Sequence, residues 1–275
     1  MRTFRKPCIA GTFLLVVASA TACTKVLHAS PPNTEPFNDD GLRIETPDKL
    51  NVEYCTKGAC IMVPLPDSLR KMSESFDLTY SYVDINGDDT NDLIVTSAEE
   101  GQVNKCSRLY IYKKSKNSLS DVITKNQICN LRIIGNTLFS NYRQGAKWRE
   151  DTYSLKNGQP KILTEDECVG CGQISRTIYK DGIASKKVLV ADTPDYNSRT
   201  PLSSQVLTNR AWIFKHPDIS SKSKSYLVRG DTVKLLEFTS NDNYWYLVEY
   251  VQKNGNSLNG WIPCPNLRVC EDSTD

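Results

Sequence analysis

The chain has 275 residues, of which 39% are hydrophobic and 24% are charged, and these are ordinary values for a globular protein. Its formal net charge is +2, and the first 22 residues carry three basic and no acidic side chains. The remainder is therefore close to neutral and has no overall attraction for nucleic acid, which we exclude as a partner. The length accommodates two small domains.

The amino terminus has the pattern of an export signal. In "MRTFRKPCIAGTFLLVVASATAC", three basic residues precede an apolar run, and small residues follow it. We expect residues 1–22 to be a signal peptide, because the apolar run is too short to anchor a protein across a bilayer.

Two interpretations of the cleavage site stay open. The small residues 20–22 suit the ordinary signal peptidase, and together with Cys23 they also resemble a bacterial lipobox, although Ala20 stands where leucine is usual. We favour a lipoprotein in which Cys23 carries a lipid that includes palmitate, and this lipid attaches the chain to a membrane. Thr24 carries no acidic retention signal, which favours the outer membrane, with the folded chain facing the periplasm.

Eight further cysteines form an even set, which in an exported chain indicates disulfide bonds. Eight thiols allow 105 pairings, so the sequence alone does not settle the connectivity. Pairing between neighbours in the sequence is the simplest expectation, and it joins Cys55 to Cys60, Cys106 to Cys129, Cys168 to Cys171 and Cys264 to Cys270.

Composition divides the chain into segments. Residues 23–42 are rich in proline, asparagine and acidic residues and predict a tether between the lipid and the fold. Residues 193–202, with two prolines, predict a linker between a first domain at 43–192 and a second at 203–275.

The first domain reads as short strands rich in valine, isoleucine, tyrosine and threonine, separated by turn residues. We expect strands at 78–85, 92–97, 108–114, 129–135, 174–180 and 186–192. The dipeptides in "KNGQ" and "KDGI" predict hairpin turns. Residues 66–76 have room for two helical turns. The predicted fold class is all-β, with a propeller-like or irregular sheet domain followed by a small barrel.

The stretch "DINGDDTNDL" places oxygen-bearing side chains at alternate positions. Asp84, Asn86, Asp88 and Asp92 stand at relative positions 1, 3, 5 and 9, and the carbonyl of Thr90 would serve at position 7. Hard oxygen ligands suit Ca²⁺. Three spaced carboxylates without a cation would repel one another, which favours a calcium loop over a polar hairpin turn, the alternative that stays open.

The loop is not an EF-hand, because Asp89 and Val95 occupy the positions where that motif has glycine and glutamate. "YVDINGDDTNDLIV" instead resembles the calcium loops of FG-GAP, integrin-type repeats. The resemblance implies one structural Ca²⁺ and, as its ligands, Asp84, Asn86, Asp88, Thr90 and Asp92.

No catalytic constellation stands out, and we expect a protein that is not an enzyme. Cys168 and Cys171 form a C-x-x-C, but acidic neighbours raise a thiol pKa, so a structural disulfide is favoured over a redox centre. No second ligand pair nearby supports zinc. His28 lies in the tether and His216 in a turn, and neither has the setting of a general base.

The carboxy-terminal part resembles a bacterial SH3-like (SH3b) domain over almost its full length. The matching stretches are "AWIFKHPD", "YLVRGDTVKLLE", "YWYLVEY" and "GWI". Gly260 allows close approach of backbones, and Trp261 would close the end of a small barrel. The family often binds cell-wall peptides or other peptides, and a packing role without a ligand is the alternative.

The combination of lipobox, tether, calcium loop and SH3b domain resembles a group of bacterial envelope lipoproteins. Known members are periplasmic immunity proteins that block peptidoglycan hydrolases. The resemblance implies a lipid-anchored inhibitor whose partner is a peptidoglycan-degrading effector. A second hypothesis is a binding module that holds cell-wall peptide of the peptidoglycan, or an envelope complex, through the SH3b domain. An enzyme using a carboxylate pair is the third.

Overall fold

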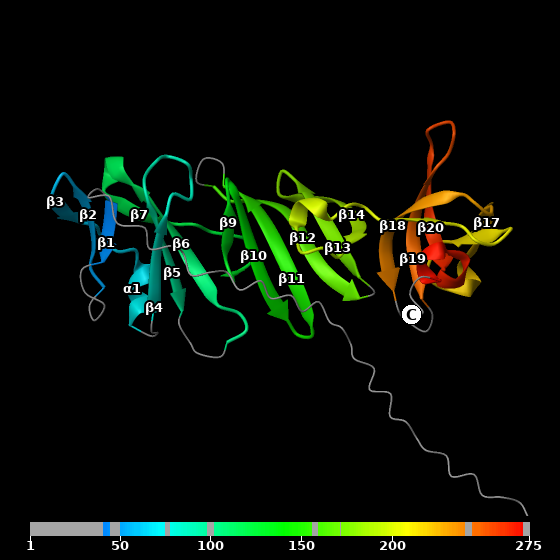
Figure 1. Cartoon of the computed structure of the whole chain (residues 1–275), viewed down its shortest axis with the longest axis horizontal. Helices are drawn as coiled ribbons and strands as arrows, with labels where there is room; N and C mark the ends of the chain where they lie inside the picture. Colours follow the sequence, from blue (N-terminus) through cyan, green and yellow to red (C-terminus); the bar gives the residue numbers. More distant parts are fainter. Residues whose placement is uncertain are drawn as a thin grey trace, which may run out of the picture.

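The computed structural model of the protein describes residues 41–44, 50–74, 78–97, 102–155, 159–170, 172–239 and 244–271. These segments form four antiparallel sheets and one short α-helix, so the expected all-β class is confirmed. Figure 1 shows the sheets following one another in a row. The expected signal peptide, Cys23 and nearly all of the tether lie outside the described residues.

Two smaller sheets form the amino-terminal end of the row (Figure 1). The first has three strands: β1 (Gly41–Ile44), β2 (Val52–Thr56) and β3 (Ala59–Met62). The second has five: β4 (Leu78–Val83), β5 (Asp92–Ser97), β6 (Cys106–Lys113), β7 (Ser118–Asp121) and β8 (Ile128–Cys129), the last paired with β6. Helix α1 (Asp67–Ser73) lies within the range where two helical turns are expected.

A six-stranded meander follows. Its strands are β9 (Arg132–Ile134), β10 (Thr137–Gln144), β11 (Lys147–Ser154), β12 (Lys161–Gly170), β13 (Gln173–Lys180) and β14 (Ile183–Ala191). Each strand pairs with the next in the chain, so the order in the sheet follows the sequence. The "KDGI" hairpin joins β13 to β14, with Asp181 and Gly182 both at positive φ. Most of the second hairpin signal, "KNGQ", lies outside the described residues.

The carboxy-terminal module is a second six-stranded sheet with the order β15-β18-β19-β20-β16-β17. Its strands are β15 (Ser203–Gln205), β16 (Ala211–Phe214), β17 (Lys222–Leu227), β18 (Thr232–Thr239), β19 (Trp245–Val251) and β20 (Ser257–Pro263). The small barrel expected from the sequence is not closed among the described residues, because β15 and β17 are the two ends of the strand path and do not pair with each other. The sheet nevertheless encloses one core, whose members include Val233, Val248 and Ile262.

Consecutive sheets are joined by shared cores, and β6 shows how. Tyr110 and Tyr112 pack into the core with the three-stranded sheet and α1, whereas Leu109 and Ile111 pack on the opposite face toward β10–β12. All four side chains are at most 5% exposed. Tyr110 and Tyr112 alternate with Leu109 and Ile111 along the strand, but both faces of the strand are buried, so the tyrosines do not mark a solvent-exposed face.

Residues 193–202, expected to be a linker, pack along the edge of the meander. The Ala191 N–H donates to the carbonyl of Thr200 at 3.1 Å, and the Leu202 N–H donates to the carbonyl of Leu189 at 2.9 Å. Leu189 is fully buried and belongs to the core of the carboxy-terminal module. The module is therefore attached to the meander by a common core as well as by the chain.

Side chains reinforce this attachment. Gln173 of the meander donates to the Tyr246 hydroxyl at 2.9 Å, and this contact is buried. At the exposed edge, the Lys187 ammonium lies 3.1 Å from the Glu237 carboxylate. Of these two side-chain contacts the buried one contributes more, because an exposed ion pair is worth about 0–1 kcal/mol.

The described residues contain three disulfides, Cys55–Cys60, Cys106–Cys129 and Cys264–Cys270, and they are three of the four expected pairs. The fourth pair involves Cys171, which lies outside the described residues. Disulfides persist in oxidising compartments, so this is the fold of an exported protein. Within the described residues, no helix has the length and apolarity needed to cross a membrane.

Candidate functional site

The acidic loop connects β4 to β5, and one carboxylate sets its shape. Asp84 accepts hydrogen bonds from the backbone N–H groups of Gly87, Asp88 and Asp89, at 2.7, 3.2 and 2.9 Å. Asp89 has φ 61° and Gly87 has φ 75°, so the chain turns through two left-handed positions. Short aspartate side chains favour such turns because they replace missing backbone partners.

Two other expected ligands also bond within the loop. The side-chain amide oxygen of Asn86 accepts the Asp88 N–H at 2.9 Å, and the Asp88 carboxylate accepts the Thr90 N–H at 2.9 Å. The Asn86 amide donates to the other oxygen of Asp88 at 3.0 Å. The side chains of Asp84, Asn86 and Asp88 therefore all bond within the loop, and the calcium site stays a prediction.

Asp92 is fully buried behind the loop. Its two oxygens accept the N–H groups of Ile85, at 3.0 Å, and of Tyr112, at 2.8 Å. Burial raises the pKa of Asp92 to about 7; the two hydrogen bonds oppose this rise, and the charges of Asp88 and Asp84 add to it. Asp92 thus ties the loop to β6.

The residues present are compatible with a calcium ion. All donors are oxygens, the set that Ca²⁺ prefers, and a carboxylate oxygen that accepts one N–H retains a second lone pair. Oxygens of Asp84, Asp88 and Asp92 do not, however, lie within 4.8 Å of one another. Among the described residues, the group that meets this distance is Glu53 with Cys55 and Cys60, and there the sulfurs form a disulfide.

A buried ionic network lies on the meander where residues 193–202 cross it. Asp166 is 2% exposed and accepts two hydrogen bonds from Arg176, at 2.7 and 2.6 Å. Arg199 donates from one nitrogen to both Asp166 and Glu150, at 2.7 Å each. Burial would lower the pKa of Arg176, but its hydrogen bonds to Asp166 outweigh burial and raise it. The network therefore fastens the 193–202 segment to strands β11 to β13.

Aromatic contacts continue from this network. The Arg176 guanidinium lies 4.4 Å from the centre of the Tyr196 ring, and the Tyr196 ring meets the edge of Phe139 at 5.3 Å. The Arg132 guanidinium lies 4.7 Å from the centre of the Phe139 ring. The two rings thus lie between two cations, and each cation–ring contact is worth about 0.5–2 kcal/mol.

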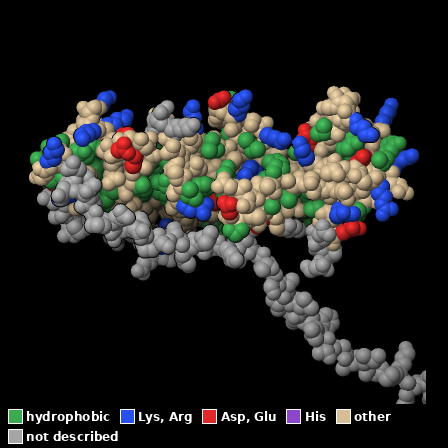
Figure 2. All heavy atoms as spheres, turned by 45° about the horizontal axis from the view of Figure 1, so that its top comes forward, with side chains coloured by type: hydrophobic (Ala, Val, Ile, Leu, Met, Phe, Trp, Pro, Cys, Tyr) green, Lys and Arg blue, Asp and Glu red, His purple; other side chains and the backbone are tan. Residues whose placement is uncertain are grey.

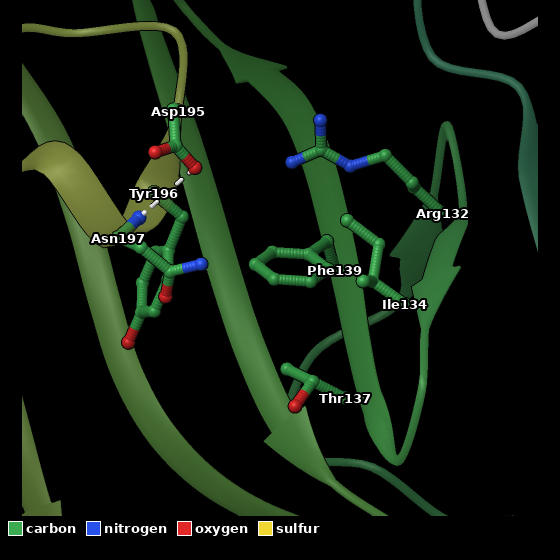
Figure 3. Close-up of a pocket in the computed structure, with 7 residues that line it drawn as sticks. All are labelled: Arg132, Ile134, Thr137, Phe139, Asp195, Tyr196 and Asn197. Atoms are coloured by element: carbon green, nitrogen blue, oxygen red, sulfur yellow. Dashed lines mark hydrogen bonds between the residues drawn. The ribbon is translucent and has the colours of Figure 1, made fainter.

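A hollow of about 130 Å³ opens beside these rings, between the β9–β10 hairpin and the turn at 195–197. Figure 3 shows the lining side chains: Arg132, Ile134, Thr137, Phe139, Asp195, Tyr196 and Asn197. Ile134 is 58% exposed at the rim, whereas Phe139 is 5% exposed. In the same view Arg132 and Asp195 come from opposite walls.

The hollow has a size and a polarity that favour a protein partner. Pockets for small molecules usually measure about 300–1,000 Å³, whereas 130 Å³ suits one side chain of a docked protein. Hydrogen bonds from the Ser198 hydroxyl and the Asn197 N–H lower the pKa of Asp195, which therefore stays ionised. The apolar wall at Phe139 lies between the cationic Arg132 and the anionic Asp195, an arrangement that suits a side chain with both apolar and polar parts.

A polar cluster on the opposite face of the meander contains a carboxylate pair. Asp151 and Glu165 lie opposite each other on β11 and β12, and the Asn126 amide donates to both, at 2.7 and 3.1 Å. Burial raises the pKa of Asp151. Burial also acts to raise the pKa of Glu165, but hydrogen bonds from Lys125 and Tyr179 outweigh it and lower that pKa. Asp151 is 1% exposed, so it lies inside the protein rather than in the hollow.

Sequence reasoning located the acidic loop but missed the network and the hollow. Glu150, Asp166 and Arg176 are buried on strands β11, β12 and β13, and because charged residues are mostly exposed, the sequence alone did not mark them as buried. Of the other residues considered, His216 lies exposed in a turn, and Cys168 lies at the end of β12.

No protein-family model matches the chain, and no curated protein matches it. Among solved structures, the chain is similar to a protein described as a Xanthomonas type IV secretion system related protein, with 19% identical residues. The match covers 53% of this chain and 84% of that chain, with a TM-score of 0.35. A TM-score this low supports no inference about fold or function, so the function must be argued from the residues themselves.

Proposed function

We propose that this exported protein is a lipid-anchored envelope protein that acts by binding another protein. We further propose that it is an immunity protein and that its partner is a peptidoglycan-degrading effector, which it inhibits. The observation that carries the protein-binding proposal is the hollow between the β9–β10 hairpin and the 195–197 turn. Its volume of about 130 Å³ suits one anchoring side chain of a partner.

The surroundings of the hollow support a preorganised binding surface. Phe139 and Tyr196 contact each other, and Arg199 fastens the 195–197 turn to two carboxylates of the sheet. A surface that is already ordered loses little conformational freedom on association, so more of the contact energy contributes to affinity. Exposed Ile134 adds apolar area at the rim.

The hydrolase as partner and the lipid anchor rest on the sequence resemblance to envelope inhibitors. In this proposal Cys23 carries the lipid in the outer membrane and the fold faces the periplasm. The loop from Asp84 to Asp92 holds one structural Ca²⁺, which neutralises its carboxylates and takes no part in catalysis.

The test uses the full mature chain with Cys23→Ser, which prevents lipid attachment, and the peptidoglycan hydrolase encoded beside the gene. Release of soluble fragments from purified peptidoglycan is measured as the chain is added. We expect inhibition that is complete near equimolar amounts. If the hydrolase stays fully active and does not bind, the immunity proposal is wrong.

A matched pair of variants tests the hollow. Ile134→Asp places a charge at its rim, and Ile183→Asp makes the same change at another exposed isoleucine beside a hairpin turn. Burying an isoleucine is worth about 1.5–3 kcal/mol, so Ile134→Asp should weaken binding about tenfold to a hundredfold. Ile183→Asp should leave it unchanged. Equal effects of the two variants would show that the partner binds elsewhere.

The alternative function, holding cell-wall peptide through the carboxy-terminal module, is favoured by the exposed Tyr226 beside Trp212. It is separated by sedimentation of the same mature chain with purified peptidoglycan. Retention that Tyr226→Ala abolishes and Ile134→Asp leaves intact would favour this alternative.

A further inference from the structure

The outer face of strands β16 and β17 carries a basic aromatic surface, which consists of Arg210, Trp212, Lys222, Lys224 and Tyr226. Trp212 and Tyr226 are directly paired across the two strands. Residues 222, 224 and 226 alternate along β17 and therefore point to the same side of the sheet. All of these except half-buried Trp212 are exposed.

Each ring of this surface has a cation above it. The Lys222 ammonium lies 3.7 Å from the centre of the Trp212 ring, and the Arg210 guanidinium lies 4.7 Å from the centre of the Tyr226 ring. The two rings meet edge to face at 5.4 Å. The rings thus hold the cations in place, and the cations present their charge outward. A ligand that stacks on a ring face would have to displace one of them, whereas an anionic ligand would not.

The charge of this region differs from that of the chain as a whole. Residues 210–229 contain five basic residues and a single acidic one, Asp218, although the chain beyond the export signal is near neutral. Within the described part of the protein, no carboxylate forms an ion pair with any of the five. Figure 2 shows blue and green side chains close together at this end of the molecule.

Edge protection alone does not account for this surface. Lysines on an edge strand such as β17 prevent pairing with another sheet, and that role would explain Lys222 and Lys224. It does not explain the basic residues on either side of the strand or the paired rings. It also does not explain the exposed aliphatic residues that flank the surface, Ile219 at 75% and Val228 at 47% exposure.

We infer that the basic aromatic surface docks on the anionic face of a lipid bilayer. Tryptophan and tyrosine with lysine and arginine are the residues that settle at a membrane interface, where rings reach the headgroup region and cations pair with phosphates. An acidic peptide would pair with the basic residues but leave Ile219 and Val228 exposed, whereas a bilayer would also bury these apolar side chains. An exported protein has such a surface within reach, so the bilayer is the occupant that charge and apolar exposure together favour. This inference does not depend on the identity of the inhibited partner.

The test measures co-sedimentation with vesicles, using the full mature chain with Cys23→Ser so that no lipid contributes. Phosphatidylcholine vesicles containing phosphatidylglycerol are compared with pure phosphatidylcholine vesicles at low and high salt. We expect binding to the anionic vesicles only, weakened by salt. The double variant Lys222→Glu/Lys224→Glu should reduce binding at least about tenfold, because each basic residue near an anionic surface contributes measurably.

Lys161→Glu/Lys180→Glu is the matched control, with the same change of charge at two exposed lysines of the meander. It should bind vesicles nearly as the unchanged chain does. Equal binding to neutral and anionic vesicles, or equal loss in the two double variants, would overturn the inference. So would binding to a polyglutamate peptide or to purified peptidoglycan without binding to anionic vesicles. Hydrolase inhibition is measured in parallel, and its presence or absence leaves the vesicle result unaffected.

Discussion

Replacing Arg199 by methionine removes the guanidinium that fastens the 193–202 segment to the meander and keeps most of the side-chain volume. Arg199 is 8% exposed at its side chain and makes two charged hydrogen bonds of 2.7 Å, to Glu150 and Asp166. A third bond, from its Nε, reaches the carbonyl of Thr193 at 3.0 Å. The variant therefore removes a positive charge from beside two buried carboxylates, as well as three hydrogen bonds.

The loss in the free energy of unfolding depends on the partners that Asp166 and Glu150 keep in the variant. Asp166 retains both hydrogen bonds from Arg176, but Glu150 retains Arg132 only at 3.6 Å, and the Glu150 side chain is 8% exposed. Removing one member of a buried ion pair costs about 3–5 kcal/mol. Because one of the two carboxylates stays well paired, we expect the lower end, about 3 kcal/mol. For a chain of this size that lowers Tm by roughly 10 °C.

The assay is urea unfolding followed by circular dichroism, with Arg229→Met as the control because Arg229 is exposed in a turn. Chymotrypsin should also cut at Tyr196 sooner in the variant. A deficit below about 1 kcal/mol, the value of an exposed ion pair, would refute the claim that this network fixes the segment.

Three further predictions concern the loop, a disulfide and a glycine. Burial raises the pKa of Asp92 to about 7, against 3.8 for an ordinary aspartate, so Asp92 ionises at a lower pH in the unfolded chain than in the folded protein. The contribution of Asp92 to stability therefore falls as the pH rises from about 4 to 7, and the Tm of the protein and of Asp92→Asn should diverge over this window. Ca²⁺ should restore Tm at pH 8 if the loop binds it. Replacing Cys106 and Cys129 by serine opens a loop with a sequence separation of 23 and should cost about 3 kcal/mol in urea unfolding. Gly260→Ala should cost about 1–3 kcal/mol, because its Cβ would lie 2.3 Å from the Ile213 side chain.

The sequence predicted those parts of the fold that depend on local patterns. Short runs rich in valine, isoleucine, tyrosine and threonine identified β4, β5, β6, β13 and β14, and "KDGI" identified the hairpin at Asp181 and Gly182. The strand expected at 129–135 is divided between β8 and β9. Neighbouring cysteines form disulfides because both partners lie on adjacent strands or on one turn, as Cys55 and Cys60 do across β2 and β3. Local pattern also indicated the acidic loop, since the hydrogen bonds that Asp84 accepts come from residues at most five positions away.

Strands β10, β11 and β12 were not predicted, and the reason is physical. They carry buried polar residues, such as Thr152, Thr164 and Asp166, that bond to partners on other strands. The rule that buried strands read as apolar fails where cross-strand hydrogen bonds replace apolar contact. The hollow could not be predicted either, because its lining residues Ile134 and Asn197 are far apart in the sequence and become neighbours only after the sheet has formed.

The shared core at Leu189 makes the protein a spacer of fixed length. Because the carboxy-terminal module is joined to β14 by packing, and to β13 through Gln173 and Tyr246, the interval between the hollow and the outer side of β17 is set by the stacking of sheets. Inserting residues into 193–202 would not extend the reach of the molecule. It would instead break the hydrogen bond between Leu202 and Leu189 and leave the carboxy-terminal module connected to the meander by the chain alone.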